Sequence, residues 1–383
     1  MTRLRSLAGR LLLSLLSLAV GIALAEGLVG LLGPDQDGRI HYAVRSRICC
    51  RPDPDVVWSL RPGIEVSRST DEFDEHVSIG SLGLRGGDPS KPRDRPWILA
   101  VGDSFTFGTG VDDDETWEAV LAATLATRDR PVEVLNAGVP GYGFDQGFGA
   151  ARKWSALLAP DLVLFGLHCT DLASDWDVPL WDLRDGRLVP LDPSHNWIGL
   201  QMRLKNSTPD LVRGLRVWRE LAGSLRHRDP FGQLPLLDWA ARTAWQRDKI
   251  VTALAGEPIP GDPRRVAVIM PCKEDLEGVS EVLWADLAGR LERAGVPVLD
   301  AGLEIRLPAA PEAARGLFYE RDIHLTPAGN RWLAARIERF LSKRGMLDGL
   351  PARPAAGATR ASGPGFGGKT VPLRATPLVG SAR

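Results

Sequence analysis

Short apolar runs alternate with amphipathic stretches through the middle of the chain. Continuous apolar runs occur at 97–101, 132–136, 161–167, 266–271 and 296–300. Helical periodicity falls between them, at about 115–128, 145–158 and 281–294. Short runs without polar positions are typical of strands that are covered on both faces. Strands and helices in this alternation predict an α/β fold with a parallel, doubly wound sheet of five strands.

The last helix has clear signals at both ends. Thr326 is expected as the N-cap and Pro327 as the first helical residue, and Gly345 ends the pattern. Leu333, Ile337, Phe340 and Leu341 form an apolar stripe along it. This helix should therefore pack on the sheet and hold the loop that precedes it.

The N-terminal segment is much more apolar than the rest of the chain. Residues 11–33 are long enough to span a bilayer, and Arg3, Arg5 and Arg10 precede them. The arginines favour an amino end in the cytoplasm and a body on the extracytoplasmic side of the cell membrane. A cleaved signal peptide ending at residues 23–25 is the alternative, although the apolar run continues beyond that point. The expected fold is therefore a flavodoxin-like three-layer α/β sandwich preceded by a single transmembrane signal anchor.

Composition divides the chain into four parts. Residues 1–33 form the cytoplasmic N-terminus and the anchor, and residues 34–95, rich in Pro, Asp, Arg and Ser, predict an extracytoplasmic stalk that packs on the main domain. The main domain spans 96–346 and contains an insertion at 172–262, which is too long for an ordinary connection. Residues 347–383 have the composition of a disordered tail. A phosphate-loop pattern within that tail is rejected, because neither a strand nor a helix can flank it.

The insertion is rich in tryptophan. It holds Trp176, Trp181, Trp197, Trp218, Trp239 and Trp245, half of the 12 tryptophans in the chain. These rings either pack the insertion's own helices, expected at about 209–224 and 235–255, or line a pocket for a sugar or an acyl chain. The insertion is the part of the chain expected to select the substrate.

Charge and cysteine content exclude several classes of partner. Lys and Arg total 47 against 48 Asp and Glu, so that no nucleic-acid partner is expected. No spacing typical of a metal site occurs, and we expect neither a metal nor a cofactor. Adjacent Cys49 and Cys50 are either a vicinal disulfide or free thiols, whereas Cys169 and Cys272 end predicted strands and are interpreted as buried small apolar residues. The sequence leaves the oligomeric state undetermined.

Candidate chemistry lies at the carboxyl ends of the predicted strands. The first strand runs into Gly102-Asp103-Ser104, where Gly102 permits a tight turn, although a helix N-cap would explain this pattern as well. A nucleophilic serine needs an imidazole and a carboxylate, and Asp322-x-His324 offers both. In an extended segment these two side chains project on the same side, and the far ring nitrogen can face Ser104. The other histidines, His41, His76, His195 and His227, are interpreted as structural.

Taken together, these motifs resemble the SGNH or GDSL-type hydrolase superfamily, in its membrane-anchored bacterial form. The resemblance covers about residues 53–345, and its first, second and last blocks correspond to residues 102–108, 136–141 and 322–329. A run at 81–86 is similar to one that precedes the nucleophile in membrane-anchored members. The third block of the family, Gly-x-Asn-Asp, appears only in altered form at 166–171, with Thr170 in place of the asparagine.

This resemblance implies a serine esterase that acts on acetyl or acyl esters of a carbohydrate or envelope component. Ser104 would be the nucleophile, His324 the general base and then acid, and Asp322 the group that orients it. The backbone amides of Ser104 and Gly141, with Thr170, would form the oxyanion hole, and a threonine hydroxyl there predicts slow turnover of simple esters. The alternatives are an acyltransferase that uses the same acyl-enzyme and a catalytically weak glycan-binding module.

Overall fold

A computed structural model describes most of the main domain and the segment before it. The described residues are 13–14, 16–25, 49–90, 93–128, 130–174, 179–191, 239–277, 284, 286–306 and 312–350. Nearly all of the expected tail and the helix expected at about 209–224 lie outside them. The expected anchor at 11–33 lies only partly inside them, and residues 16–25 are helical. None of the helices among the described residues combines the length and hydropathy needed to cross a membrane.

Five parallel strands form the central sheet. They are β5 (Trp97–Val101), β6 (Glu133–Asn136), β7 (Leu162–Leu167), β10 (Arg264–Ile269) and β11 (Val298–Asp300). Their spatial order is β11-β10-β7-β5-β6, and every neighbouring pair is parallel. Numbered along the chain this order is 2-1-3-4-5, that of a flavodoxin-like sheet. The α/β fold with a parallel five-stranded sheet is confirmed.

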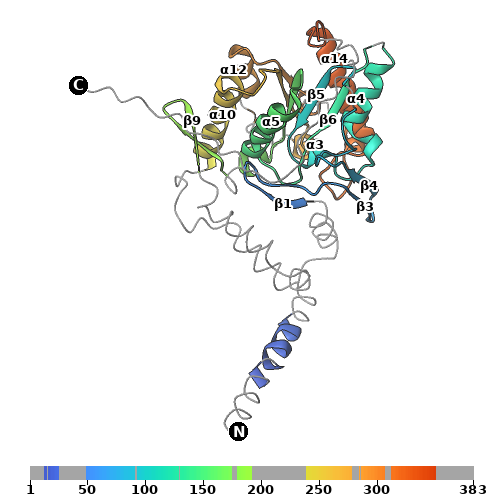
Figure 1. The fold of residues 1–383 in the computed structure, drawn as a ribbon, viewed down its shortest axis with the longest axis vertical. Helices are drawn as coiled ribbons and strands as arrows, with labels where there is room; N and C mark the ends of the chain where they lie inside the picture. The colour runs from blue at the N-terminus through green and yellow to red at the C-terminus, as the bar shows by residue number, and fades with distance from the viewer. Residues whose placement is uncertain are drawn as a thin grey trace, which may run out of the picture.

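Helices cover both faces of the sheet (Figure 1). On one face lie α5 (Phe144–Leu158), α10 (Trp239–Gly256) and α12 (Leu287–Arg293), and on the other lie α4 (Trp117–Ala126), α13 (Leu303–Arg306) and α14 (Pro327–Lys343). Strand β5 shows why two separate cores result. Leu99 packs in the core on the side of α5, and Ile98 packs in the core on the side of α4, because successive side chains of a strand point to opposite faces.

The signals predicted for the last helix are confirmed in α14. The Thr326 hydroxyl accepts a hydrogen bond from the backbone N–H of Gly329 at 3.1 Å, and Pro327 is the first helical residue. Leu333 and Ile337 are buried against the sheet, while Asn330 accepts a hydrogen bond from the backbone N–H of Trp117 at 3.1 Å. The helix thus holds the chain immediately after His324.

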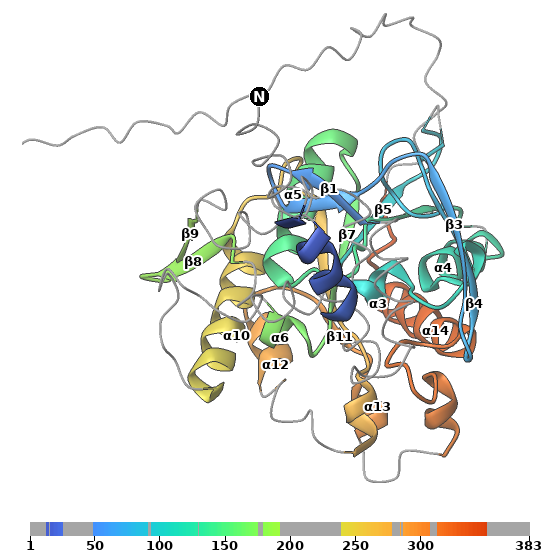
Figure 2. The same cartoon turned by 90° about the horizontal axis from the view of Figure 1, so that it is seen from below.

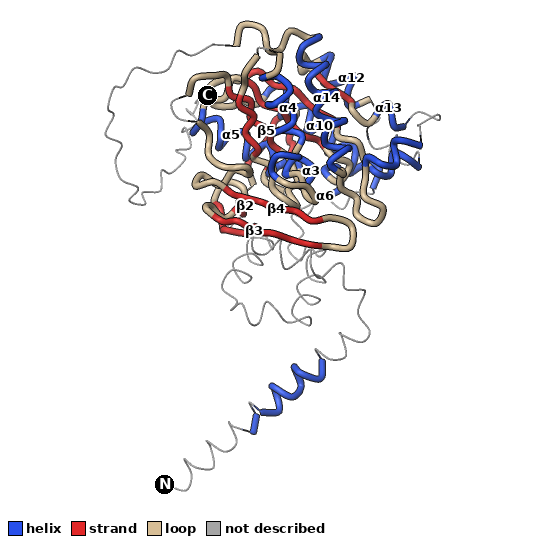
Figure 3. The backbone as a smooth tube through the Cα atoms, turned by 90° about the vertical axis from the view of Figure 1, so that its right-hand side faces the viewer, coloured by secondary structure: helices blue, strands red, loops and turns tan. Residues whose placement is uncertain are grey.

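The segment before the main domain forms two antiparallel hairpins. Strand β1 (Cys49–Asp53) pairs with β2 (Val57–Leu60), and β3 (Ile64–Ser69) pairs with β4 (Asp74–Ile79). Val56 and Val77 belong to the same buried cluster as the central strand β5, and Arg85 forms β-bridges with Ile79 and with Asn136 at the end of β6. The β3–β4 hairpin lies across the end of the body where α3 lies (Figure 3). This part of the segment expected as a stalk is therefore in contact with the main domain.

Several short elements complete the fold. They are α3 (Ser104–Phe107), α6 (Asp171–Ser174), β8 (Trp181–Arg184), β9 (Arg187–Pro190), and the 3₁₀ turns η1 (Asp113–Glu115), η2 (Lys273–Glu277) and η3 (Glu312–Leu317). The β8–β9 hairpin and α10 belong to the insertion, and they lie side by side at one edge of the body (Figure 2). Trp181 packs edge-on against Phe148, with centroids 5.5 Å apart, and the Lys249 ammonium lies 4.3 Å from the Trp245 ring centroid. Trp181 therefore packs against the core, and Trp245 lies beside the buried Lys249.

Cys169 and Cys272 form a disulfide, which corrects the interpretation of them as separate buried residues. Both are buried, and their Cα atoms are 6.3 Å apart. The pairing arises because β7 and β10 are neighbours in register, Leu167 opposite Ile269, so that residues just beyond the two strand ends meet. Cys49 and Cys50 lie in β1, and their side chains fall outside the described residues.

Candidate active site

The turn after β5 presents Ser104 as the first residue of a one-turn helix, α3. Gly102 is required there, because a Cβ atom would lie 2.3 Å from the Thr106 hydroxyl and 2.9 Å from the carbonyl oxygen of Gly166. Asp103 is the N-cap and accepts a hydrogen bond from the backbone N–H of Phe105 at 2.8 Å. The N-cap interpretation of the Gly-Asp-Ser pattern is confirmed, and the N-cap and the candidate nucleophile are neighbours.

Ser104, His324 and Asp322 form a continuous hydrogen-bonded chain. The Ser104 hydroxyl oxygen lies 2.8 Å from Nε2 of His324, and Nδ1 of His324 lies 2.5 Å from a carboxylate oxygen of Asp322. The same oxygen accepts a hydrogen bond from the backbone N–H of His324 at 2.8 Å, which restrains the carboxylate beside the ring. With the ring proton on Nδ1, the lone pair of Nε2 faces the serine. The arrangement can therefore remove the serine proton.

The loop that carries Asp322 and His324 is tightly held. The backbone N–H of Tyr319 donates to the carbonyl of His324 at 3.2 Å, and Phe318 and Leu325 form a β-bridge. Glu72 and Lys273 also bind the backbone of this loop, and the sequence analysis missed both of them. No local sequence signal could have found them, since one is in a distant hairpin and the other follows β10.

The loop after β6 lies beside the turn that carries Ser104. The Asn136 amide donates to the carbonyl of Thr106 at 2.9 Å, and the backbone N–H of Val139 donates to the carbonyl of Gly102 at 3.0 Å. Two residues further along, Gly141 is exposed and has a φ of 81°. Within the described residues, neither the Ser104 N–H nor the Gly141 N–H donates to a protein acceptor. Both amides are therefore available as oxyanion donors, the role predicted for them.

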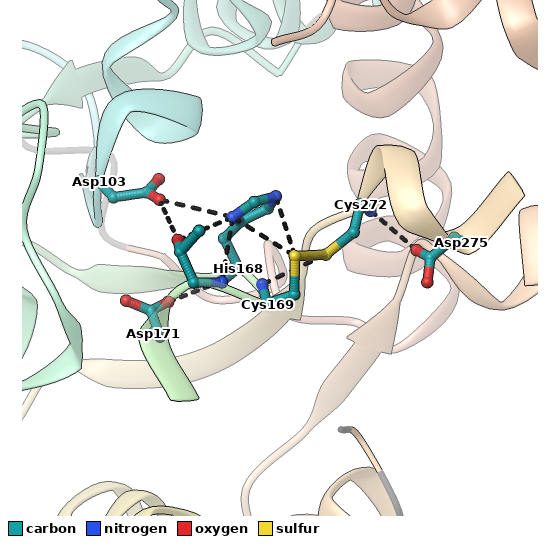
Figure 4. The surroundings of a disulfide bond; sticks show 7 residues. Asp103, His168, Cys169, Asp171, Cys272 and Asp275 are labelled. Atoms are coloured by element: carbon teal, nitrogen blue, oxygen red, sulfur yellow. Dashed lines mark hydrogen bonds and ion pairs between the residues drawn. A yellow bond between two sulfur atoms is a disulfide. The ribbon is translucent and has the colours of Figure 1, made fainter. Parts of the chain in front are cut away.

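Thr170 has partners other than an oxyanion. Its hydroxyl donates to a carboxylate oxygen of Asp103 at 3.2 Å and lies 2.9 Å from Nδ1 of His168. Figure 4 shows the His168 ring between the Asp103 carboxylate and the disulfide. A hydroxyl has one hydrogen, and here it is donated in the hydrogen bond to the Asp103 carboxylate. In this arrangement the candidate oxyanion donors are the two backbone amides.

Burial governs the protonation of the groups behind Ser104. Burial lowers the pKa of His168 well below its usual range, and the nearby charge of His324 acts in the same direction. The His168 ring is therefore neutral, and it stacks on Phe105 with centroids 3.6 Å apart. Burial also raises the pKa of Asp103, against the opposing effect of the hydrogen bond from the backbone N–H of Phe105.

One group of side chains could be mistaken for a metal site. Among the described residues, His168, Cys169 and Cys272 bring three potential ligand atoms within 4.8 Å of one another. The two sulfur atoms are bonded to each other, as Figure 4 shows, so that the thiolates a metal would need are already joined.

The family to which this site belongs is identified by sequence. Residues 100–332 match the model of the GDSL-like lipase/acylhydrolase family, and this span contains Ser104, Asp322 and His324. None of the curated proteins matches the chain.

Several solved structures are distantly similar. A lipolytic protein of the G-D-S-L family from Desulfitobacterium hafniense DCB-2 is 16% identical over 64% of this chain and 100% of its own, with a TM-score of 0.34. A lipase/acylhydrolase from Enterococcus faecalis is 14% identical over 65% of this chain and 96% of its own, with a TM-score of 0.38. The acetylxylan esterase Axe2 from Geobacillus stearothermophilus is 14% identical over 64% of this chain and 94% of its own, with a TM-score of 0.34. Because residues 100–332 match the family model, the chain belongs to the GDSL-like lipase/acylhydrolase family and is an ester-hydrolysing enzyme.

Proposed function

We propose that the protein is an extracytoplasmic serine esterase that removes acetyl or acyl groups from a carbohydrate or envelope component. One observation carries the chemistry: His324 lies between the Ser104 hydroxyl, 2.8 Å from Nε2, and the Asp322 carboxylate, 2.5 Å from Nδ1. This geometry supplies a base for the serine and a fixed tautomer for the base.

The first half of the reaction forms an acyl-enzyme. Nε2 of His324 takes the hydroxyl proton as the Ser104 oxygen attacks the ester carbonyl carbon. The carbonyl oxygen becomes an oxyanion, which the backbone N–H groups of Ser104 and Gly141 stabilise. The imidazolium then gives its proton to the leaving alcohol, and the carbon–oxygen bond of the ester breaks.

The second half returns the enzyme to its starting state. A water molecule replaces the alcohol, His324 takes one of its protons, and the hydroxide attacks the acyl carbon. Ser104 leaves with the proton from Nε2, and a carboxylic acid is released. A sugar hydroxyl in place of water would make the enzyme an acyltransferase, so that the two activities differ only in the acceptor.

The extracytoplasmic location is part of the proposal. The apolar segment at 11–33, preceded by three arginines, supports a membrane anchor. The Cys169–Cys272 disulfide supports an oxidising compartment. Cell fractionation tests this: the full chain should stay with membranes at high salt and alkaline pH. A soluble exported form beginning at Glu26 would instead show a cleaved signal peptide.

The catalytic part of the proposal is tested with the full chain in mild detergent. Wild type should release nitrophenol from a short-chain nitrophenyl ester and acetate from an acetylated polysaccharide, whereas Ser104→Ala should lose this activity and keep its melting temperature. Activity of Ser104→Ala within about tenfold of wild type, less than about 1.4 kcal/mol in the barrier, would remove Ser104 as the nucleophile. Adding a sugar acceptor and measuring acetyl transfer against acetate release separates hydrolase from transferase.

A further inference from the structure

Glu72 binds the loop that carries the Asp322 and His324 side chains. Its two carboxylate oxygens accept hydrogen bonds from consecutive backbone N–H groups, those of Arg321 and Asp322, each at 2.8 Å. Glu72 lies in the turn between β3 and β4, outside the span 100–332 that matches the family model. A residue of the N-terminal segment thus binds the backbone of the loop that carries Asp322 and His324.

Lys273 binds the carbonyl groups of the same loop. The Lys273 ammonium donates to the backbone carbonyls of Tyr319 at 2.9 Å, Glu320 at 2.6 Å and Asp322 at 3.3 Å. Glu72 therefore satisfies the N–H groups of this stretch and Lys273 its carbonyls. Hydrogen bonds to charged groups are stronger than neutral ones, and here they act on the peptide groups next to Asp322.

The turn that carries Glu72 is itself rigid. The Thr70 hydroxyl accepts hydrogen bonds from the backbone N–H groups of Glu72 at 3.2 Å and Phe73 at 3.0 Å, and it donates to the Phe73 carbonyl at 3.0 Å. The buried Phe73 ring packs on Tyr319, with centroids 4.8 Å apart. The carboxylate is therefore held at a fixed point relative to the loop that it binds.

The hairpin also binds the segment that follows Ser104. Buried Glu75 pairs with Arg68 at 2.7 Å and accepts the backbone N–H of Gly110, and the Tyr319 hydroxyl donates to the carbonyl of Gly110 at 2.6 Å. Further along, the Arg85 guanidinium donates to the carbonyls of Phe107 at 2.7 Å and Gly108. The contacts of Glu75 hold the hairpin without Glu72, so that removing the Glu72 carboxylate should free the N–H groups of Arg321 and Asp322 and leave the hairpin in place.

We propose that Glu72 is a positioning residue for ester hydrolysis, which keeps Asp322 and His324 in line with Ser104. This inference rests on the proposed function, since Glu72 acts only through the Asp322–His324 pair. A displacement of about 1 Å in a reacting group can lower a rate about a hundredfold, and two strong hydrogen bonds to adjacent peptide groups are suited to prevent it.

The test compares Glu72→Ala and Glu72→Gln with Asp71→Asn in the full chain. Asp71 is the matched control, because it lies in the same turn and its substitution removes the same charge. Its side chain is exposed and forms a surface ion pair with the Arg321 guanidinium at 3.5 Å. The measurements are kcat, KM, melting temperature and the rate at which an alkyl fluorophosphonate labels Ser104.

Glu72→Ala should lower kcat and the labelling rate about ten- to a hundredfold, with KM changed less than about twofold, while all variants stay folded at the assay temperature. Glu72→Gln keeps one acceptor oxygen and should recover part of the loss, and Asp71→Asn should match wild type. Equal kcat in Glu72→Ala and Asp71→Asn would overturn the positioning role, as would a loss that only follows the folded fraction. Failure of the fluorophosphonate to label wild-type Ser104 would instead remove the proposed function itself.

Discussion

The hydroxyl of Thr170 donates a hydrogen bond to the buried carboxylate of Asp103, the residue immediately before the candidate nucleophile, at 3.2 Å. Nδ1 of His168 lies 2.9 Å from the same hydroxyl oxygen and 3.8 Å from the Asp103 carboxylate. The position where the resemblance implies an asparagine amide therefore holds a side chain that stabilises the N-cap of α3.

The first prediction concerns the loss of this hydroxyl. Thr170→Ala should lower kcat by less than about tenfold, because the hydrogen already used by Asp103 is not available to the oxyanion. Steady-state kinetics on a nitrophenyl ester measure the effect. A loss of about a hundred- to thousandfold would mean that the hydroxyl turns to the oxyanion during the reaction.

The second prediction restores the amide. An amide has two N–H donors, so that an asparagine at position 170 can keep a bond to Asp103 and offer the second N–H to the oxyanion. Thr170→Asn should raise kcat by about tenfold or more and change KM little, since the added donor acts in the transition state. Lower activity of this variant than of Thr170→Ala would exclude an oxyanion role for this position.

The third prediction concerns the carboxylate that orients His324. Asp322→Asn should lower kcat by about 10⁴, because an amide that donates to Nδ1 would put the ring proton on Nε2, facing Ser104. The far-ultraviolet circular dichroism should stay that of wild type, since the same-sized side chain remains in the loop. A variant with near-normal kcat would show that another group fixes the ring.

The fourth prediction concerns the disulfide. Cys169 and Cys272 are 103 residues apart, and closing a loop of about 100 residues is worth about 4.7 kcal/mol in the chain-entropy model. Reduction should therefore lower the free energy of unfolding by about this amount. Urea unfolding with and without reductant measures it, with Cys49→Ser and Cys50→Ser as the background that removes other thiols. An unchanged midpoint, with both thiols shown to be reduced, would contradict the prediction.

The fifth prediction concerns Glu118, a buried acid on α4. It is 1% exposed, and neither of its carboxyl oxygens has a hydrogen-bond partner among the described residues. Burial raises its pKa well above the ordinary value of 4.5, and the interaction with its own backbone N–H and then the charge of Arg85 offset this only in part. The folded protein thus keeps a proton that the unfolded chain loses.

Stability linked to Glu118 should therefore fall as the pH rises from about the unfolded-state value of 4.5 through the raised pKa of the folded state. Glu118→Gln removes this dependence. The variant should gain stability relative to wild type over that range and show little difference at lower pH. Melting temperatures over a pH series provide the measurement, and parallel curves at every pH would refute it.

Local signals explain why part of this fold could be predicted. The apolar run of β5 and the Thr326–Pro327 start of α14 are each specified within a few residues, and both appear as expected. The approach of Asp322 and His324 to Ser104 follows from strand ends that share one edge of the sheet.

The missed features all depend on the arrangement of distant elements. The pairing of Cys169 with Cys272 requires β7 and β10 to be neighbours, and the sequence of neither strand determines which strand lies beside it. The position of Glu72 beside Asp322 joins residues 250 apart in the chain. The direction of the Thr170 hydroxyl depends on Asp103 and His168, which only the folded sheet edge brings together.

The disulfide also determines whether the protein stays in one piece after a single proteolytic cleavage in the insertion. Cys169 precedes the insertion at 172–262 and Cys272 follows it, so that the insertion lies inside a covalently closed ring. A protease that cleaved the chain once between the two cysteines would leave one molecule, with Ser104 on one fragment and His324 on the other, still joined at adjacent strands. Removal of part of the insertion by two such cuts would likewise leave the serine and its base on covalently joined fragments.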